Sequence, residues 1–210
     1  HPYNLPLNDK KVFDFFASGD LDNIFGFNHH ELKEVFKQFR PNSINDLSII
    51  NALFRPHLHR VIPFVVKHKI NSEYAFKFSD ERVSEILEET YCQFFYHETF
   101  LNFLKTIAGI PFSEGDKWRI RISRDKTVSE RTAFSSVFAK GCRENSALSE
   151  FEIQLLARIS TEMLPMFFQK SHSFCYAMIS YWGAYYRFYF REEFDNAFKG
   201  GIKFQKFELL

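Results

Sequence analysis

The stretch Phe168-Gln169-Lys170-Ser171-His172-Ser173-Phe174-Cys175-Tyr176 places a lysine, a hydroxyl and an imidazole side by side before an aromatic segment. The pattern predicts a loop that leads into a long helix from about Ser173 to Phe190. Lys170 can neutralise a phosphate, Ser171 can bind a phosphate or cap the helix, and His172 can donate a hydrogen bond. A helix N-terminus favours anions as well. A capped core helix preceded by a solvated lysine explains the same tripeptide, so these residues alone do not define a site.

Composition argues against a broadly basic protein. The chain has 210 residues, of which 27 are basic and 26 acidic, so any basic site must be local. The length fits one domain or two small ones, and an aromatic content of 19% supplies a substantial core. The sequence has no run of about 18 uncharged apolar residues, so no membrane span is predicted. It also shows no signal-peptide pattern, and its three cysteines are scattered, so we expect reduced thiols in a cytoplasmic protein.

Apolar residues recur at helical spacing along most of the chain and predict a mainly α fold with ten or eleven helices. Thr127 with Glu130 and Ser149 with Glu152 have the spacing of capping boxes. Gly141 is predicted to end the helix that Thr127 opens. Extended structure is expected at most as a small strand pair, with candidates at residues 24–27, 71–80, 91–96 and 202–210. We expect residues 1–199 to form one helical domain and residues 200–210 to form a C-terminal tail.

Several catalytic signatures are missing from the sequence. It contains no GxxxxGK[ST] loop, no GxGxxG turn and no GxSxG elbow. Zinc would need more ligands than His57-x-His59 and the pair His29-His30 provide. Asp20 and Asp22 have a D-x-D spacing, but they follow Gly19 in a predicted solvated turn, so we regard that match as accidental. No catalytic and no metal-binding residue is therefore predicted.

The remaining chemistry is cationic. Arg119, Arg121 and Arg124 lie on one predicted helix, and Arg121 and Arg124 are neighbours on its surface. Together with Arg55 and Lys170 they would surround a triphosphate or a nucleic-acid backbone, provided that the fold brings them together. Basic residues are densest between residues 55 and 69, which fits either a phosphate-facing segment or a solvated face.

Five stretches stand in a fixed order along the chain: Pro6–Asp9 with Ile24–His29, Phe39–Pro56, Glu89–Thr99, Ala108–Arg121 and Phe168–Tyr181. They are similar to the motifs P-L-D-D with I-F-Q-[FL]-E-S, L-K-P-[DN]-x-[FI]-x-D-L through A-L-[FY]-R-P-G-P, E-T-Y-G-x-x-x-Y-Q-E-Q, A-G-[YF] with A-D-x-L-R-R-A-M-G-K-K, and F-N-K-S-H-A-x-x-Y. With these motifs in this order, the chain resembles the fingers region of the bacterial DNA polymerase III alpha subunit, a C-family polymerase. The resemblance extends from about Pro6 to Phe198.

The chain departs from the family pattern at several positions that the resemblance would place near the incoming nucleotide or the template. His57 and Leu58 replace the glycine and proline after R-P, and Asn28-His29 replaces E-S. Ile120 stands where the second arginine of R-R is expected, so Arg121 is the candidate to take over its role. Asp125 replaces a basic residue. These changes fit a divergent member of the family.

The resemblance implies the part of a replicative-type polymerase that closes over the incoming deoxynucleoside triphosphate and guides template DNA. The implied partners are DNA, the triphosphate, and the palm and thumb of the same polymerase. The catalytic aspartates of the family lie in the palm, and nothing in this chain matches them. Magnesium is therefore expected only in the whole enzyme, and the chain alone is expected to polymerise nothing. The residues expected to contact nucleotide or DNA phosphates are Arg55, Arg119, Arg121, Arg124, Lys170, Ser171 and His172.

The alternative is a degenerate C-family-like protein that kept the fold and acts as a non-catalytic nucleic-acid-binding or interaction module. The chain is accordingly expected to be either a fragment of a polymerase or a truncated relative. The sequence leaves open whether a replicative or an error-prone subtype is involved.

Overall fold

The computed structural model describes residues 2–55, 58–74, 76–124 and 127–199. Helices make up 75% of the structure, which has eleven α-helices and no β-strand in these ranges. The prediction of a mainly α fold is confirmed. The predicted C-terminal tail at residues 200–210 lies outside the described residues, and so does the candidate strand at residues 202–210.

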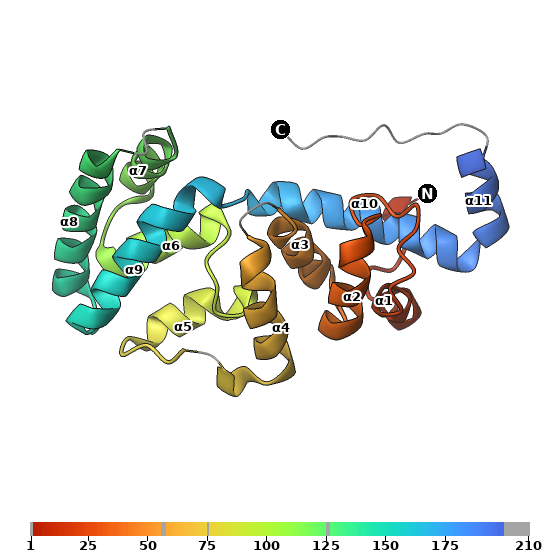
Figure 1. Cartoon of the computed structure of the whole chain (residues 1–210), viewed down its shortest axis with the longest axis horizontal. Helices are drawn as coiled ribbons and strands as arrows, with labels where there is room; N and C mark the ends of the chain where they lie inside the picture. Colours follow the sequence, from red (N-terminus) through yellow and green to blue (C-terminus); the bar gives the residue numbers. More distant parts are fainter. Residues whose placement is uncertain (1, 56–57, 75, 125–126, 200–210) are drawn as a thin grey trace. The chain divides into compact units, whose positions relative to one another are not determined.

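Contacts divide the chain into two compact units. Figure 1 labels their helices. The central unit comprises the described residues of Arg55–Lys170, and the split unit comprises those of His1–Phe54 and Ser171–Leu210. The central unit contains α4 (Ile62–Ile70), α5 (Glu81–Leu87), α6 (His97–Ala108), α7 (Phe112–Arg124), α8 (Val128–Asn145) and α9 (Glu150–Met163). It also contains four short 3₁₀ turns: η2 (His59–Val61), η3 (Ser72–Tyr74), η4 (Glu88–Thr90) and η5 (Leu164–Met166). The split unit contains η1 (Pro2–Asn4), α1 (Lys10–Ala17), α2 (His30–Phe39), α3 (Ile44–Leu53), α11 (Arg191–Lys199) and all but the first residue of α10 (Lys170–Tyr189).

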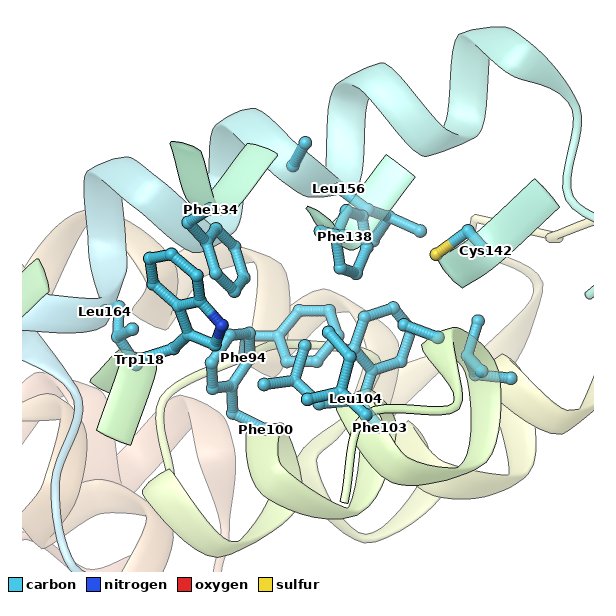
Figure 2. Packing of buried hydrophobic residues seen from close by; sticks show 14 of the residues in the cluster. Phe94, Phe100, Phe103, Leu104, Trp118, Phe134, Phe138, Cys142, Leu156 and Leu164 are labelled. Atoms are coloured by element: carbon cyan, nitrogen blue, oxygen red, sulfur yellow. The ribbon is translucent and has the colours of Figure 1, made fainter. Parts of the chain in front are cut away.

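Phenylalanine dominates the core of the central unit, where α6 and α8 face each other and α7 and α9 flank them (Figure 2). The rings of Phe103 and Phe138 lie 5.8 Å apart, and Trp118 meets Phe134 edge-on at 5.7 Å. The thiol of Cys142 is buried in the same cluster, and burial raises its pKa to about 12. Each of these large side chains removes considerable apolar surface from water, so the cluster is the main source of cohesion in this unit.

Gly141 does not end α8, which continues to Asn145, so the prediction of a helix end there was wrong. A Cβ atom built on Gly141 would lie 2.1 Å from the carbonyl oxygen of Ala108, the last residue of α6. Glycine is therefore needed because two backbones approach each other closely, and not because the helix stops. Helix capping was predicted correctly elsewhere: Ser149 and Glu152 form a capping box at the start of α9.

Two candidate strands are turns instead. Tyr91 and Cys92 have φ angles of +53° and +57°, in the left-handed region, so the chain from residue 91 cannot run as a regular strand. Among the residues that the structure describes, Tyr96 forms an isolated β-bridge to Phe168. At residues 24–27, the N–H of Phe27 donates to the carbonyl of Ile24 at 3.1 Å, which makes a turn that buries both side chains. In the described part of residues 71–80, the chain forms the 3₁₀ turn Ser72–Tyr74 and no strand.

In the split unit, polar side chains of α10 fasten the loops before and between the first helices. Ser173 donates to the carbonyl of Ser48 at 2.6 Å, and Ser180 donates to that of Phe25 at 2.7 Å. The hydroxyl of Tyr181 donates to the carbonyl of Pro6 at 2.9 Å. The buried Arg187 donates to the carbonyls of Asp20 and Asp22 and forms an ion pair with the Asp20 carboxylate. The D-x-D pair is thus part of a structural contact within this unit.

Candidate phosphate-binding site

The N-terminal end of α6 is tied to the segment that leads into α10. The N–H of Phe168 donates to the carbonyl of Phe95 at 2.8 Å, and the N–H of His97 donates to the carbonyl of Phe168 at 2.9 Å. The guanidinium of Arg55 lies over the Phe168 ring, 4.3 Å from its centroid. Partial burial lowers the pKa of Arg55, which nevertheless remains a cation because arginine is so basic. This contact fixes Arg55 beside the first turn of α6.

His97, the first residue of α6, lies among charges of both signs. Burial lowers its pKa to about 4, and the positive charge of Arg119 adds to this effect. Arg55 also acts in this direction, whereas Glu98 and Asp116 act against it. The Nδ1 atom of His97 is buried and has no hydrogen-bond partner among the described residues. The imidazole is therefore neutral at physiological pH and leaves the surrounding positive charge to the arginines.

Lys170 is the first residue of α10, so the predicted loop of Lys170, Ser171 and His172 is instead the first turn of the helix. Its backbone N–H donates to the carboxylate of Glu98 at 2.9 Å. Its side-chain ammonium forms a 2.6 Å ion pair with Glu89. The protein itself therefore supplies anions to the lysine that was expected to face a phosphate.

The arginines of α7 point in different directions. Residues two apart on a helix lie about 200° apart around its axis, so Arg119 and Arg121 cannot share one face. Arg119 forms an ion pair with Asp116 at 2.7 Å and contributes to the field at His97. Arg121 lies 4.3 Å from the centroid of the Trp118 ring and pairs with Glu130 of α8 at 2.8 Å. Arg124 is exposed at the last residue of α7.

Of the predicted residues, the structure brings Arg55, Arg119 and Lys170 to the N-terminal end of α6. Arg121 and Arg124 are not among these three. Ser171 and His172 belong to the split unit, where both are exposed and the imidazole of His172 stacks on Tyr176 with 4.5 Å between ring centroids. We call Arg55, Arg119 and Lys170 the cation cluster.

Sequence reasoning missed four residues that surround the cation cluster: His97, Glu89, Glu98 and Asp116. Glu89, His97 and Glu98 lie within one stretch that carried the family resemblance, which is the only signal that pointed to them. Their partner Lys170 is 72 residues away from Glu98 and 81 residues away from Glu89. No local spacing could therefore have shown that these carboxylates meet the lysine.

Metal ligands and membrane spans are both lacking among the described residues. No group of three or more histidine, cysteine, aspartate or glutamate side chains there is arranged to hold a metal ion. No helix in the same ranges is both long and apolar enough to cross a membrane.

Fold and charge together define an all-helical protein with a local cluster of cations at one helix end. Residues 1–146 match the family described as the bacterial DNA polymerase III alpha subunit finger domain, so the chain belongs to this family.

Similar proteins agree with this family. The chain is 31% identical over 208 residues to DNA polymerase III subunit alpha of Ureaplasma parvum, an alignment that covers 99% of this chain and 21% of that protein. It is 29% identical to the subunit of Borreliella burgdorferi (92% of this chain, 17% of that protein) and 28% identical to that of Aquifex aeolicus (98% and 19%). The chain thus spans about a fifth of the length of these relatives.

Proposed function

We propose that this chain is the fingers part of a replicative-type DNA polymerase and contacts the incoming deoxynucleoside triphosphate and template DNA. Its membership of the finger-domain family supports this proposal, as do relatives named as polymerase subunits. The relatives extend well beyond the aligned region, so DNA synthesis belongs to the proposal for a whole polymerase that includes a palm and a thumb. Such an enzyme would act in the cytoplasm.

One observation carries the proposal: Arg55, Arg119 and Lys170 converge on the first turn of α6 from three distant segments of the chain. Guanidinium and ammonium groups form charge-assisted hydrogen bonds with phosphate oxygens. Each such bond is worth about 1.5–3 kcal/mol in a formed site. Three cations at the start of α6 therefore favour a ligand with several negative charges, such as a triphosphate.

The predicted phosphate-binding residues outside the cation cluster are proposed to contact other parts of the ligand. Arg121 and Arg124, toward the C-terminal end of α7, are proposed to contact the DNA backbone. Ser171 and His172, in the first turn of α10, are proposed as hydrogen-bond donors to a phosphate.

Magnesium enters this proposal only for the whole polymerase, where the metal ions stabilise the attacking and leaving oxygens of nucleotidyl transfer. The described residues offer no cluster of ligands that fits it, so we derive no step through the metal here. We expect the purified chain, given magnesium, primer–template DNA and all four nucleotides, to extend no primer. Primer extension by the chain alone would contradict this assignment.

Binding of the purified chain to inorganic tripolyphosphate and to a primer–template duplex, measured over a range of salt concentrations, tests the proposal. We expect weak binding that falls as salt rises. Lys170→Ala and Arg119→Ala should each weaken tripolyphosphate binding about three- to tenfold, which is part of the energy of one charge-assisted bond. Lys105→Ala is the matched control, because Lys105 is exposed in the last turn of the same helix α6.

Equal losses in Lys105→Ala and Lys170→Ala would reduce the effect to net charge and contradict a specific site. Complete absence of binding at low salt would contradict nucleotide and DNA contact by this chain and would favour the non-catalytic interaction module.

A further inference from the structure

Carboxylates around the cation cluster already bind the lysine that is proposed to contact a phosphate. Lys170 already makes two contacts with carboxylates: its backbone N–H donates to Glu98 at 2.9 Å, and its ammonium donates to Glu89 at 2.6 Å. A phosphate that binds the remaining N–H groups of the ammonium would lie close to the Glu89 carboxylate, and the two negative charges would repel each other. Any phosphate at this lysine therefore competes with an internal anion.

The backbone around Glu89 is held firmly, so its position is not accidental. Glu89 lies in the 3₁₀ turn Glu88–Thr90. The buried hydroxyl of Thr90 donates to the carbonyl of Leu87 at 3.0 Å. Tyr91 follows in a left-handed conformation. The hydroxyl of Thr99, on α6, also approaches the Glu89 carboxylate at 3.5 Å. The turn thus directs this carboxylate towards Lys170.

The ion pair between Glu89 and Lys170 is also accessible to a ligand. The side chain of Lys170 is 32% exposed and that of Glu89 is 45% exposed. Solvent screens such a pair, and its contribution is small enough for a multiply charged ligand to displace it. By contrast, Glu98 accepts from a backbone N–H that stays in place when the lysine side chain moves.

We propose that Glu89 is a positioning residue that holds Lys170 in the absence of ligand and gives way when a phosphate binds. This inference rests on the proposed function, because it assigns Lys170 to phosphate binding. Glu89 then sets the affinity of the site by competition: the lysine exchanges a carboxylate for a phosphate oxygen, and the displaced carboxylate returns to water. Glu98 keeps the start of α10 fixed during this exchange.

The first test compares Glu89→Gln with Glu88→Gln in binding of inorganic tripolyphosphate by the full chain. Glu88 carries the same charge one residue earlier, is exposed, and makes no side-chain hydrogen bond or ion pair in the part of the chain that the structure describes. Glu89→Gln should bind tripolyphosphate about two- to fivefold more tightly than the unsubstituted chain, the range expected for a half-exposed pair. Glu88→Gln should change binding less. The gain should vanish in Glu89→Gln combined with Lys170→Ala.

Equal gains in the two glutamine variants would overturn the inference, since net charge would then explain both. A gain that persists without Lys170 would overturn it as well.

A second measurement separates this inference from the proposed function. Acylation of Lys170 by a water-soluble reagent, quantified by mass spectrometry, reports on the ion pair without any nucleotide. Glu89→Gln should raise labelling of Lys170 relative to Lys105, and Glu88→Gln should not. Unchanged labelling of Lys170 in Glu89→Gln would contradict the proposal that Glu89 positions this lysine. If labelling rises but no variant binds tripolyphosphate, the ion pair between Glu89 and Lys170 is supported. Phosphate binding at Lys170, and therefore competition between Glu89 and a phosphate, would then be rejected.

Discussion

Two groups of ion pairs in the central unit use the same residue types but differ in how completely they are enclosed. Asp80 is buried, with a side-chain exposure of 6%, and accepts from Arg82 at 2.6 Å and from the N–H of Ala147 at 3.0 Å. Arg82 donates in addition to the carbonyls of Thr106 and Asn145. The cation cluster pairs with Glu89 and Asp116 instead, at the solvent boundary.

The difference separates an ion pair that holds the fold from one that can exchange partners. The contact between Asp80 and Arg82 links the start of α5 to the ends of α6 and α8, because Arg82 also donates to the carbonyls of Thr106 and Asn145. Only the carboxylate of this pair is enclosed, since Arg82 is 44% exposed, so removing Arg82 would leave the buried Asp80 without its cation. The pairs of Lys170 and Arg119 are partly solvated, so water or a ligand can replace the carboxylates at little cost. The two groups should therefore differ in how much stability is lost when a partner is removed.

The largest effect is expected for Asp80→Asn. The substitution removes the charge that Arg82 pairs with and puts an amide NH2 in place of the carboxylate oxygen that accepts from Arg82 and from the N–H of Ala147. We expect a loss of about 2–4 kcal/mol in the free energy of unfolding, measured by urea denaturation. Glu81→Gln, an exposed neighbour, is the control and should change stability by less than about 0.5 kcal/mol. Similar losses in both variants would remove the distinction between the enclosed and the open pairs.

The enclosed carboxylates also predict a loss of stability in acid. Its hydrogen bonds from Arg82 lower the pKa of Asp80 to about 2. Burial raises the pKa of Glu152, but hydrogen bonds from Ser149 and Ser79 outweigh this and lower the pKa to about 2. A carboxylate with a lowered pKa stabilises the fold fully above its ordinary pKa, and that contribution disappears as the pH falls towards the folded-state value. Stability should therefore fall steeply between about pH 4.5 and pH 2, and less steeply in Asp80→Asn.

His97 predicts a separate pH dependence near the cation cluster. Burial lowers its pKa to about 4, so the unfolded chain takes up the proton first as the pH falls from the ordinary value of 6.5. The contribution is complete above about pH 6.5 and is lost between pH 6.5 and pH 4. We expect a loss of about 1–2 kcal/mol over that range, measured by thermal denaturation, less than the pKa shift alone would give because the ring is partly exposed. His97→Gln should flatten the dependence; an unchanged slope would assign it to another group.

A smaller effect is expected for Asp116→Asn. This substitution removes the partner of Arg119 in a pair whose aspartate is 46% exposed. The free energy of unfolding should change by less than about 1 kcal/mol in urea denaturation. A loss as large as that of Asp80→Asn would place the pair among the structural contacts and argue against an exchangeable site.

The smallest effect is expected for Lys170→Ala. The substitution removes the ion pair with Glu89 but keeps the backbone hydrogen bond to Glu98 and a good helix former at the start of α10. Stability should stay within about 0.5 kcal/mol of the unsubstituted chain, so that any loss of phosphate binding reflects the site itself. Unfolding at markedly lower urea would show that Lys170 serves the fold.

The sequence by itself determined the helical fold and the start of several helices. Apolar residues at helical spacing along most of the chain predicted the mainly α fold, because that spacing decides which face of a helix is buried. Thr127 and Ser149 cap the helices that they were expected to open, since capping depends on residues only a few positions apart. The order of the motifs along the chain also indicated the family, because that order is a property of the sequence alone.

Only the tertiary structure decided which charges meet and what the glycines do. Gly141 follows the sequence rule for a helix end, yet it serves a contact with Ala108 that no local pattern reveals. Arg119 joins Arg55 and Lys170 whereas Arg121 pairs with Glu130, because packing fixed the orientation of α7. Glu89 and Glu98 reach Lys170 across more than seventy residues of chain. Such contacts depend on how the helices pack against one another. The sequence shows which face of each helix is apolar, but it does not show which other helix will cover that face.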